Sequence, residues 1–162
     1  MTTDVLRGAL HSAVRTALLL LGHHLHLRRD RIGRVVETER GELVVFRESV
    51  CVGVRPGTVT LHVWFHLRGV PAGSCVRSRV FEHLSLVNTP LFAGWEGYRV
   101  KLWMVEPRTV DYAGLYSWTT RAEAERYGGY ITAVLRPLST PGSVGYTVFD
   151  EPLEDHLEKR WL

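Results

Sequence analysis

The pattern of apolar residues divides the chain into a helical start followed by a series of strands. Apolar residues recur at spacings of three and four between residues 4 and 27, which predicts an amphipathic helix. Two β-branched runs, residues 34–37 and 43–47, flank a connection that contains Gly41 and therefore predict a β-hairpin. We interpret residues 1–57 as an N-terminal extension of helix plus hairpin, an accessory layer beside a main domain.

A change of pattern at Thr58 marks the start of that main domain. Residues 58–68 are rich in β-branched and aromatic side chains and predict a strand, in which successive side chains point to opposite faces. One face then carries polar and aromatic residues, and the other is apolar. The first set is His62, Trp64, His66 and Arg68, and the second is Leu61, Val63, Phe65 and Leu67.

The remaining elements complete a recognisable order. A helical apolar face between residues 76 and 91 is followed by two strands, residues 98–106 and 112–118, that suit an antiparallel hairpin. Thr120 and Glu123 have capping-box spacing and open a second helix, which Pro137 ends or kinks. A last strand covers residues 143–149, and residues 151–162 form a tail with the spacing of a short helix. Strand, helix, strand, strand, helix, strand is the ferredoxin-like βαββαβ pattern, so the fold class is α+β with this domain at residues 58–150.

Such a sheet carries both helices on one face and leaves the other face bare. If Val100, Leu102 and Met104 face the helices, an unusually aromatic set of side chains occupies the bare face. Exposed apolar patches of this kind usually mark an interface or a ligand cleft. We therefore predict a homodimer, in which two sheets form a dimeric α+β barrel around a small-molecule pocket. The predicted face adds to His62, Trp64 and His66 the residues Arg99, Lys101, Trp103, Tyr112, Tyr116 and Trp118.

Composition narrows the class of protein further. The 162 residues have a formal charge of +3 without a long basic run, although Arg28, Arg29, Arg31 and Arg34 cluster. This cluster could attract phosphate or an acidic partner, but a solvated basic surface is the simpler interpretation, and no nucleic-acid partner is predicted. Two cysteines without metal-ligand spacing and no apolar run of about 20 residues indicate a cytoplasmic protein without a signal peptide or membrane span.

Three segments together resemble the YdhR-like monooxygenases of the dimeric α+β barrel superfamily, which also holds the antibiotic biosynthesis monooxygenases. They are residues 88–103, residues 112–118, and residues 134–139 with 141–144. The resemblance covers about residues 58–150. The relatives that it implies include cofactor-independent oxygenases of phenolic polyketides, polyketide cyclases, haem-degrading enzymes and ligand-sensing domains. The fold alone does not decide which of these functions this chain has.

Three residues are candidates for catalysis. His62 and His66 lie on one strand face about 13 Å apart, so they cannot share one metal ion, but either could be a general base because imidazole titrates near neutral pH. Lys101 beside Arg99 and Trp103 could stabilise an enolate or phenolate. The alternatives are hydrogen-bonded interface histidines, salt bridges across a dimer, and aromatic residues that serve packing before substrate stacking.

The preferred function is that of a small cofactor-independent monooxygenase-type oxidoreductase acting on a phenolic or enolic small molecule, with natural-product biosynthesis as the expected setting. A histidine would deprotonate the substrate so that its anion reacts with dioxygen. The alternatives are a cyclase or isomerase that uses the same base, and a small-molecule-binding module without turnover. No flavin, haem or metal motif is evident, and His23, His24 and His26 are interpreted as surface groups at the helix C-terminus, so no cofactor is predicted.

Overall fold

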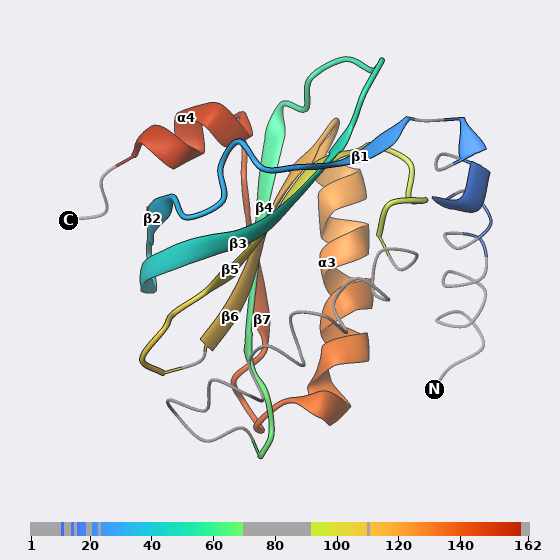
Figure 1. The fold of residues 1–162 in the computed structure, drawn as a ribbon. Coiled ribbons are helices and arrows are strands. Elements are labelled where there is room, and N and C mark those ends of the chain that lie inside the picture. Colours follow the sequence, from blue (N-terminus) through green and yellow to red (C-terminus); the bar gives the residue numbers. More distant parts are fainter. Residues whose placement is uncertain are drawn as a thin grey trace.

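The computed structural model describes residues 11, 14, 16–18, 21–22, 24–69, 92–109 and 111–159. Seven strands and two α-helices carry the described architecture (Figure 1). The strands are β1 (Leu25–Arg28), β2 (Val35–Thr38), β3 (Gly41–Cys51), β4 (Val59–His66), β5 (Tyr98–Val105), β6 (Asp111–Trp118) and β7 (Gly145–Phe149). The helices are α3 (Arg121–Leu135), the 3-10 turn η2 (Arg136–Leu138) and α4 (Leu153–Glu158).

The described strands form one antiparallel sheet in the order β1-β3-β5-β6-β4-β7, with β2 paired to β3. Within it, β7-β4-β6-β5 has the order and the all-antiparallel pairing of a ferredoxin-like sheet, and α3 connects β6 to β7. The predicted α+β class and ferredoxin-like domain are therefore confirmed. No helix in the described part of the chain combines the length and apolar composition that a membrane span needs.

The predicted hairpin of residues 34–47 is present as β2 and β3, and it belongs to the main sheet. β3 pairs with β5 along most of its length, with Val45 opposite Met104 and Ser49 opposite Lys101. The extension predicted as an accessory layer thus continues the ferredoxin-like sheet at its β5 edge. This position brings Phe46 of β3 to the same sheet face as the aromatic residues of β5 and β6.

Each face of the sheet is covered by a different helix, as Figure 1 shows for α3 and α4. α3 packs on the face that carries Leu61, Val63 and Tyr116. α4 packs on the opposite face through Leu153 and Leu157, which join a second cluster. The other buried members of that cluster are Val36, Leu43, Val45, Leu102, Met104, Ala113 and Leu115. The predicted bare face is therefore largely covered within one chain.

Local sequence signals account for the ends of α3. Thr120 is its N-cap and accepts a hydrogen bond from the backbone N–H of Glu123, as the capping-box spacing predicts. At the other end Pro137 lies in the 3-10 turn η2, where the α-helix has stopped. The predicted strands at 58–68, 98–106, 112–118 and 143–149 are confirmed with ends that shift by a few residues.

The helices predicted for residues 4–27 and 76–91 are not confirmed as the sequence suggested. The helix predicted for residues 4–27 is helical at the described positions 11, 14, 16–18 and 21, but residues 25–27 belong to β1 instead. Leu25 and His26 there pair with Cys51 and Val50 of β3, because a strand edge offers the backbone partners that a frayed helix end lacks. His26 is thus a strand residue, contrary to the prediction. The helix predicted for residues 76–91 lies outside the described residues.

The tail forms the predicted short helix, and arginines of the basic cluster hold it in place. Arg31 forms ion pairs with both Glu48 of β3 and Glu154 of α4, and Arg34 donates a hydrogen bond to the carbonyl of Leu157. Glu48 is fully buried, so its charge needs the guanidinium. These two arginines therefore have a structural role, whereas the sequence predicted a solvated basic surface.

Candidate active site between the sheet and α3

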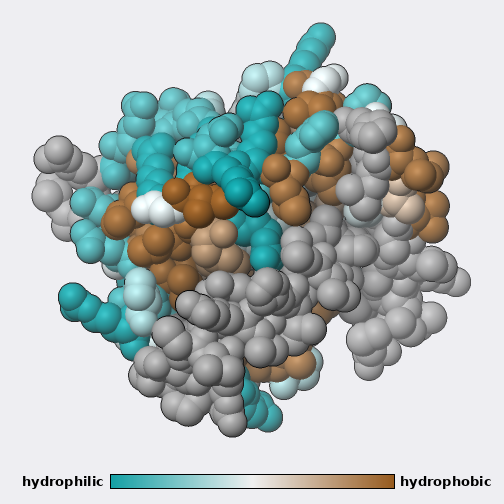
Figure 2. Space-filling view, in the orientation of Figure 1, coloured by the Kyte–Doolittle hydropathy of each residue, from teal (hydrophilic) through white to brown (hydrophobic). Residues whose placement is uncertain are grey.

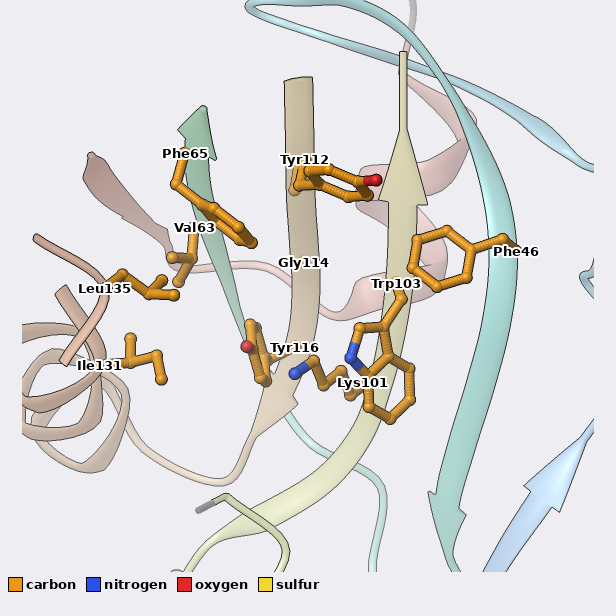
Figure 3. Close-up of a pocket in the computed structure, with 11 residues that line it drawn as sticks. Phe46, Val63, Phe65, Lys101, Trp103, Tyr112, Gly114, Tyr116, Ile131 and Leu135 are labelled. Carbon is orange, nitrogen blue, oxygen red and sulfur yellow. The ribbon is translucent and has the colours of Figure 1, made fainter. Parts of the chain in front are cut away.

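A small pocket lies between the sheet and α3, with about 20 Å³ of enclosed space and about 400 Å³ when the open solvent at its mouth is counted (Figure 3). Its walls come from four strands and the helix, and they are almost entirely apolar or aromatic. The lining residues are Phe46, Val63, Phe65, Lys101, Trp103, Tyr112, Ala113, Gly114, Tyr116, Ile131 and Leu135. Concave apolar sites with one or a few polar groups are the usual form of small-molecule sites.

Lys101 is the cationic residue of this pocket. Its side chain is only 4% exposed, and Nζ lies 4.1 Å from the ring centre of Phe92, 4.3 Å from that of Trp103 and 4.8 Å from that of Tyr116. In Figure 3 the amine points from β5 across the floor of the pocket toward Tyr116. Among the residues that the structure describes, no carboxylate pairs with it.

The electrostatic surroundings favour the neutral amine. Burial away from water and the nearby positive charge of Arg47 together hold the pKa of Lys101 well below its usual value. The three rings attract the ammonium form, but each such contact contributes only about 0.5–2 kcal/mol. Lys101 is therefore suited to accept a proton from a bound molecule.

Tyr116 and Gly114 shape the floor of the pocket. A Cβ atom on Gly114 would lie 2.8 Å from the Tyr116 ring, so only glycine lets this ring fold back over β6. Burial raises the pKa of Tyr116 far above its usual value, which keeps the phenol protonated. The aromatic wall continues into α3, where the rings of Tyr116 and Tyr127 are 5.3 Å apart.

The sheet separates the residues that the sequence predicts on one face. Lys101, Trp103 and Tyr116 face α3, whereas His62 and Trp64 lie on the opposite face. The prediction was wrong for β5 and β6 because Leu102 and Met104 are buried against α4 and the hairpin, not against α3. A register shift after Tyr98 also places Tyr98 and Lys101 on one face, although they are three residues apart.

A second pocket lies on that opposite face and occupies about 650 Å³ with the solvent at its mouth. His62 lines it, fully buried, with Nδ1 2.8 Å from Oε1 of Glu39 in the hairpin turn. Burial opposes ionisation of Glu39, but the hydrogen bond and charge of His62 lower its pKa on balance. Arg40 stacks at 4.7 Å on the ring of Trp64. The two predicted residues His62 and Trp64 thus help to hold the hairpin tip on the sheet.

The other predicted site residues lie away from the first pocket or serve the core. His66 is half-buried at the end of β4, with Nδ1 2.8 Å from Oδ1 of Asp111. Arg99 donates hydrogen bonds to the carbonyls of Arg55 and Tyr98 at the start of β5. Trp118 is fully buried against Tyr98 and α3 and does not line the pocket. Tyr112 does line it, and its ring stacks on Phe65 at 5.7 Å.

Sequence reasoning missed several lining residues. Phe46 belongs to the hairpin, whose pairing with β5 no local pattern reveals. Ile131 and Leu135 are on the apolar stripe of α3, and a stripe does not distinguish packing from pocket lining. Val63 and Phe65 are the missed lining residues that the sequence could have indicated. The alternating pattern of residues 58–68 places both on the apolar face of the strand.

The described residues contain no group of three or more His, Cys, Asp or Glu side chains placed to hold a metal ion.

Comparison with known proteins gives structural likenesses only. No protein-family model and no curated protein matches the sequence. A ferredoxin-fold protein of Listeria monocytogenes related to antibiotic biosynthesis monooxygenases is 13% identical, with a TM-score of 0.49 over 68% of this chain and 64% of that one. The haem-degrading enzyme LmHde from the same species is 14% identical, with a TM-score of 0.49 over 68% and 71%. SnoaB, a cofactor-independent oxygenase from Streptomyces nogalater, is 22% identical, with a TM-score of 0.40 over 56% and 89%. The fold assignment rests on the strand order, and the resemblance to YdhR-like monooxygenases stays a prediction.

Proposed function

We propose that this protein is a cofactor-independent oxygenase of a phenolic or enolic small molecule, which binds between the sheet and α3. The observation that carries the proposal is the amine of Lys101, buried among aromatic rings in an apolar pocket without a carboxylate partner among the described residues. An uncharged amine in such a site can accept the proton of a phenol, whereas an ammonium group cannot.

In the proposed reaction the substrate hydroxyl donates its proton to Nζ of Lys101. The resulting ammonium then lies beside the phenolate, where the exclusion of water strengthens their attraction. The electron-rich anion reduces dioxygen and forms a carbon–oxygen bond to it. Loss of water from the hydroperoxide leaves a carbonyl, so that a phenol with a free ring position and one dioxygen give a quinone and one water. The ammonium returns its proton to the peroxide anion to give this hydroperoxide, and the hydrogen on the oxygenated ring carbon leaves with the hydroperoxide OH as the water.

This mechanism moves the base from the histidines to Lys101. His62 and Lys101 lie on opposite faces of the sheet, so a molecule in the pocket beside α3 does not contact both. Trp103, Tyr112 and Tyr116 keep their predicted role of substrate contact, now around Lys101. The proposal also includes the predicted cytoplasmic location.

Oxygen uptake tests this proposal directly. Purified protein is mixed with naphthols, hydroquinones and anthrones in an oxygen electrode, and products are identified by mass spectrometry. Lys101→Met should lower the rate about 10²–10³-fold, the usual cost of losing a positioned base or charge stabiliser. Lys159→Met is the matched control, because Lys159, the C-cap residue of α4, pairs with Glu151 away from this pocket.

Three other outcomes would contradict the oxygenase proposal. Product formation at the same rate without dioxygen would indicate the cyclase or isomerase. Saturable binding of the compounds, followed by tryptophan fluorescence, without any product would indicate a binding module. Full oxygen uptake by Lys101→Met would remove Lys101 as the base, provided that circular dichroism shows both variants folded.

A further inference from the structure

The use of lysine in this chain is unusual. The sequence has 18 arginines and only two lysines, Lys101 and Lys159, so arginine supplies nearly all of its positive charge. Lys159 is on the surface, with its side chain 45% exposed, whereas Lys101 lines the pocket. Arginine stays protonated in proteins, and lysine can lose its proton. A buried lysine in such a chain therefore indicates an amine that takes part in chemistry, either by accepting a proton or by donating its electron pair.

Two features of the site activate an amine as a nucleophile. The first is removal from water, since Lys101 is almost fully buried among Phe92, Trp103 and Tyr116. The second is a neighbouring cation, Arg47, whose guanidinium lies 5.7 Å from the ring centre of Trp103. Lysines that form Schiff bases are activated in these same two ways.

We propose that Lys101 forms a covalent imine with an apolar aldehyde or ketone bound in the pocket between the sheet and α3. The lone pair of Nζ attacks the carbonyl carbon, and a carbon–nitrogen bond forms while the carbonyl oxygen takes up a proton. The carbinolamine then loses its oxygen as water as the nitrogen gives up its hydrogen. One amine and one carbonyl thus give one imine and one water, with no oxidant or reductant.

The walls of the pocket select the carbonyl compound. Val63, Ile131 and Leu135 offer aliphatic surface on one side, and Phe65 and Tyr112 offer rings on another (Figure 3). Among the described residues, no acidic side chain lines the pocket, so an apolar aromatic aldehyde fits better there than a cationic one. The inference rests on the same pocket as the proposed function, but it does not require dioxygen.

Reductive trapping tests the proposal with 2-naphthaldehyde as the probe. The protein is incubated anaerobically with the aldehyde and sodium cyanoborohydride, which reduces an imine to a stable secondary amine. Cleavage after arginine releases residues 100–108 with Lys101, separately from the peptide that contains Lys159. We expect the naphthylmethyl group on Lys101 at least about tenfold faster than on Lys159 at pH 7, because each unit of lowered pKa raises the neutral fraction about tenfold.

Two lysine-to-arginine variants serve as controls for this experiment. Lys101→Arg keeps a positive charge and should abolish labelling of that peptide, while Lys159→Arg should leave it unchanged. The trapping rate at Lys101 should also rise with pH to a midpoint below that of Lys159. Equal labelling of both lysines, or none at Lys101 while the aldehyde quenches tryptophan fluorescence, would overturn the proposal. Because the assay excludes dioxygen, its result is independent of the oxygenase test.

Discussion

Lys101 lowers the stability of this fold in the pH range where its unfolded form is charged. Its pKa is well below the usual value in the folded chain, chiefly because it is buried, and near about 10.4 when the chain unfolds. Between these two values the unfolded state binds one more proton than the folded state. The free energy of unfolding therefore rises with pH across this window, and the cost of burying Lys101 is largest below it.

Replacing the amine should remove this cost. We expect Lys101→Met to be more stable than the unaltered protein at pH 7, with an advantage that shrinks as the pH rises toward about 10. Urea denaturation at several pH values measures the difference, with Lys159→Met as the control at a surface site. A constant difference across this range would contradict a lowered pKa of Lys101.

Arg31 connects the sheet to α4 through its ion pairs with Glu48 and Glu154. The helix has only six residues, too few to be stable alone, so its position depends on Leu153, Leu157 and the ion pairs of Arg31. One Arg31 partner, Glu48, is fully buried, and its Oε2 atom has no hydrogen-bond partner among the described residues. Loss of the guanidinium would leave a buried charge without compensation.

We expect Arg31→Ala to lower the free energy of unfolding by about 3 kcal/mol, the usual cost of breaking a buried ion pair. The double variant Arg31→Ala with Glu48→Gln should recover part of this loss, because it removes the stranded charge. Arg28→Ala is the matched control, since Arg28 makes only an exposed contact of 3.5 Å with Asp30. Equal midpoints for Arg28→Ala and Arg31→Ala in urea would rule out this role.

Most of the aromatic residues from which the sequence predicted a dimer are buried within the folded chain. Trp103, Tyr116 and Trp118 are buried against α3 within one chain, so they form no exposed patch. Apolar side chains remain exposed elsewhere, including Leu27, Ile32 and Val35 near β1 and β2. On the face shown in Figure 2, such apolar surface is interspersed with polar side chains. The homodimer is therefore a proposal that rests on the family resemblance and on this edge.

Light scattering coupled to size exclusion tests that proposal. At micromolar concentration we expect a mass about twice the 18.4 kDa of one chain. Val35→Glu should weaken the association if the β1 and β2 edge forms the contact, because a buried unpaired carboxylate is unfavourable. A mass of one chain at all concentrations would contradict the dimer without affecting the pocket, whose described lining comes from a single chain.

The sequence by itself determined the strands, the α3 cap and the ferredoxin-like order, because these depend on local alternation, capping and turn residues. It also placed Lys101 and Trp103 on one side of β5, since side chains alternate with period two. Only the tertiary structure decided which side faces α3. β5 and β6 are buried on both faces, by α3 on one and by α4 with the hairpin on the other, so both faces carry large apolar residues. Alternation then shows that the two faces differ, but it does not show what covers each face. The sequence therefore did not reveal that Lys101 lines the pocket beside α3 while His62 lines the pocket on the opposite face.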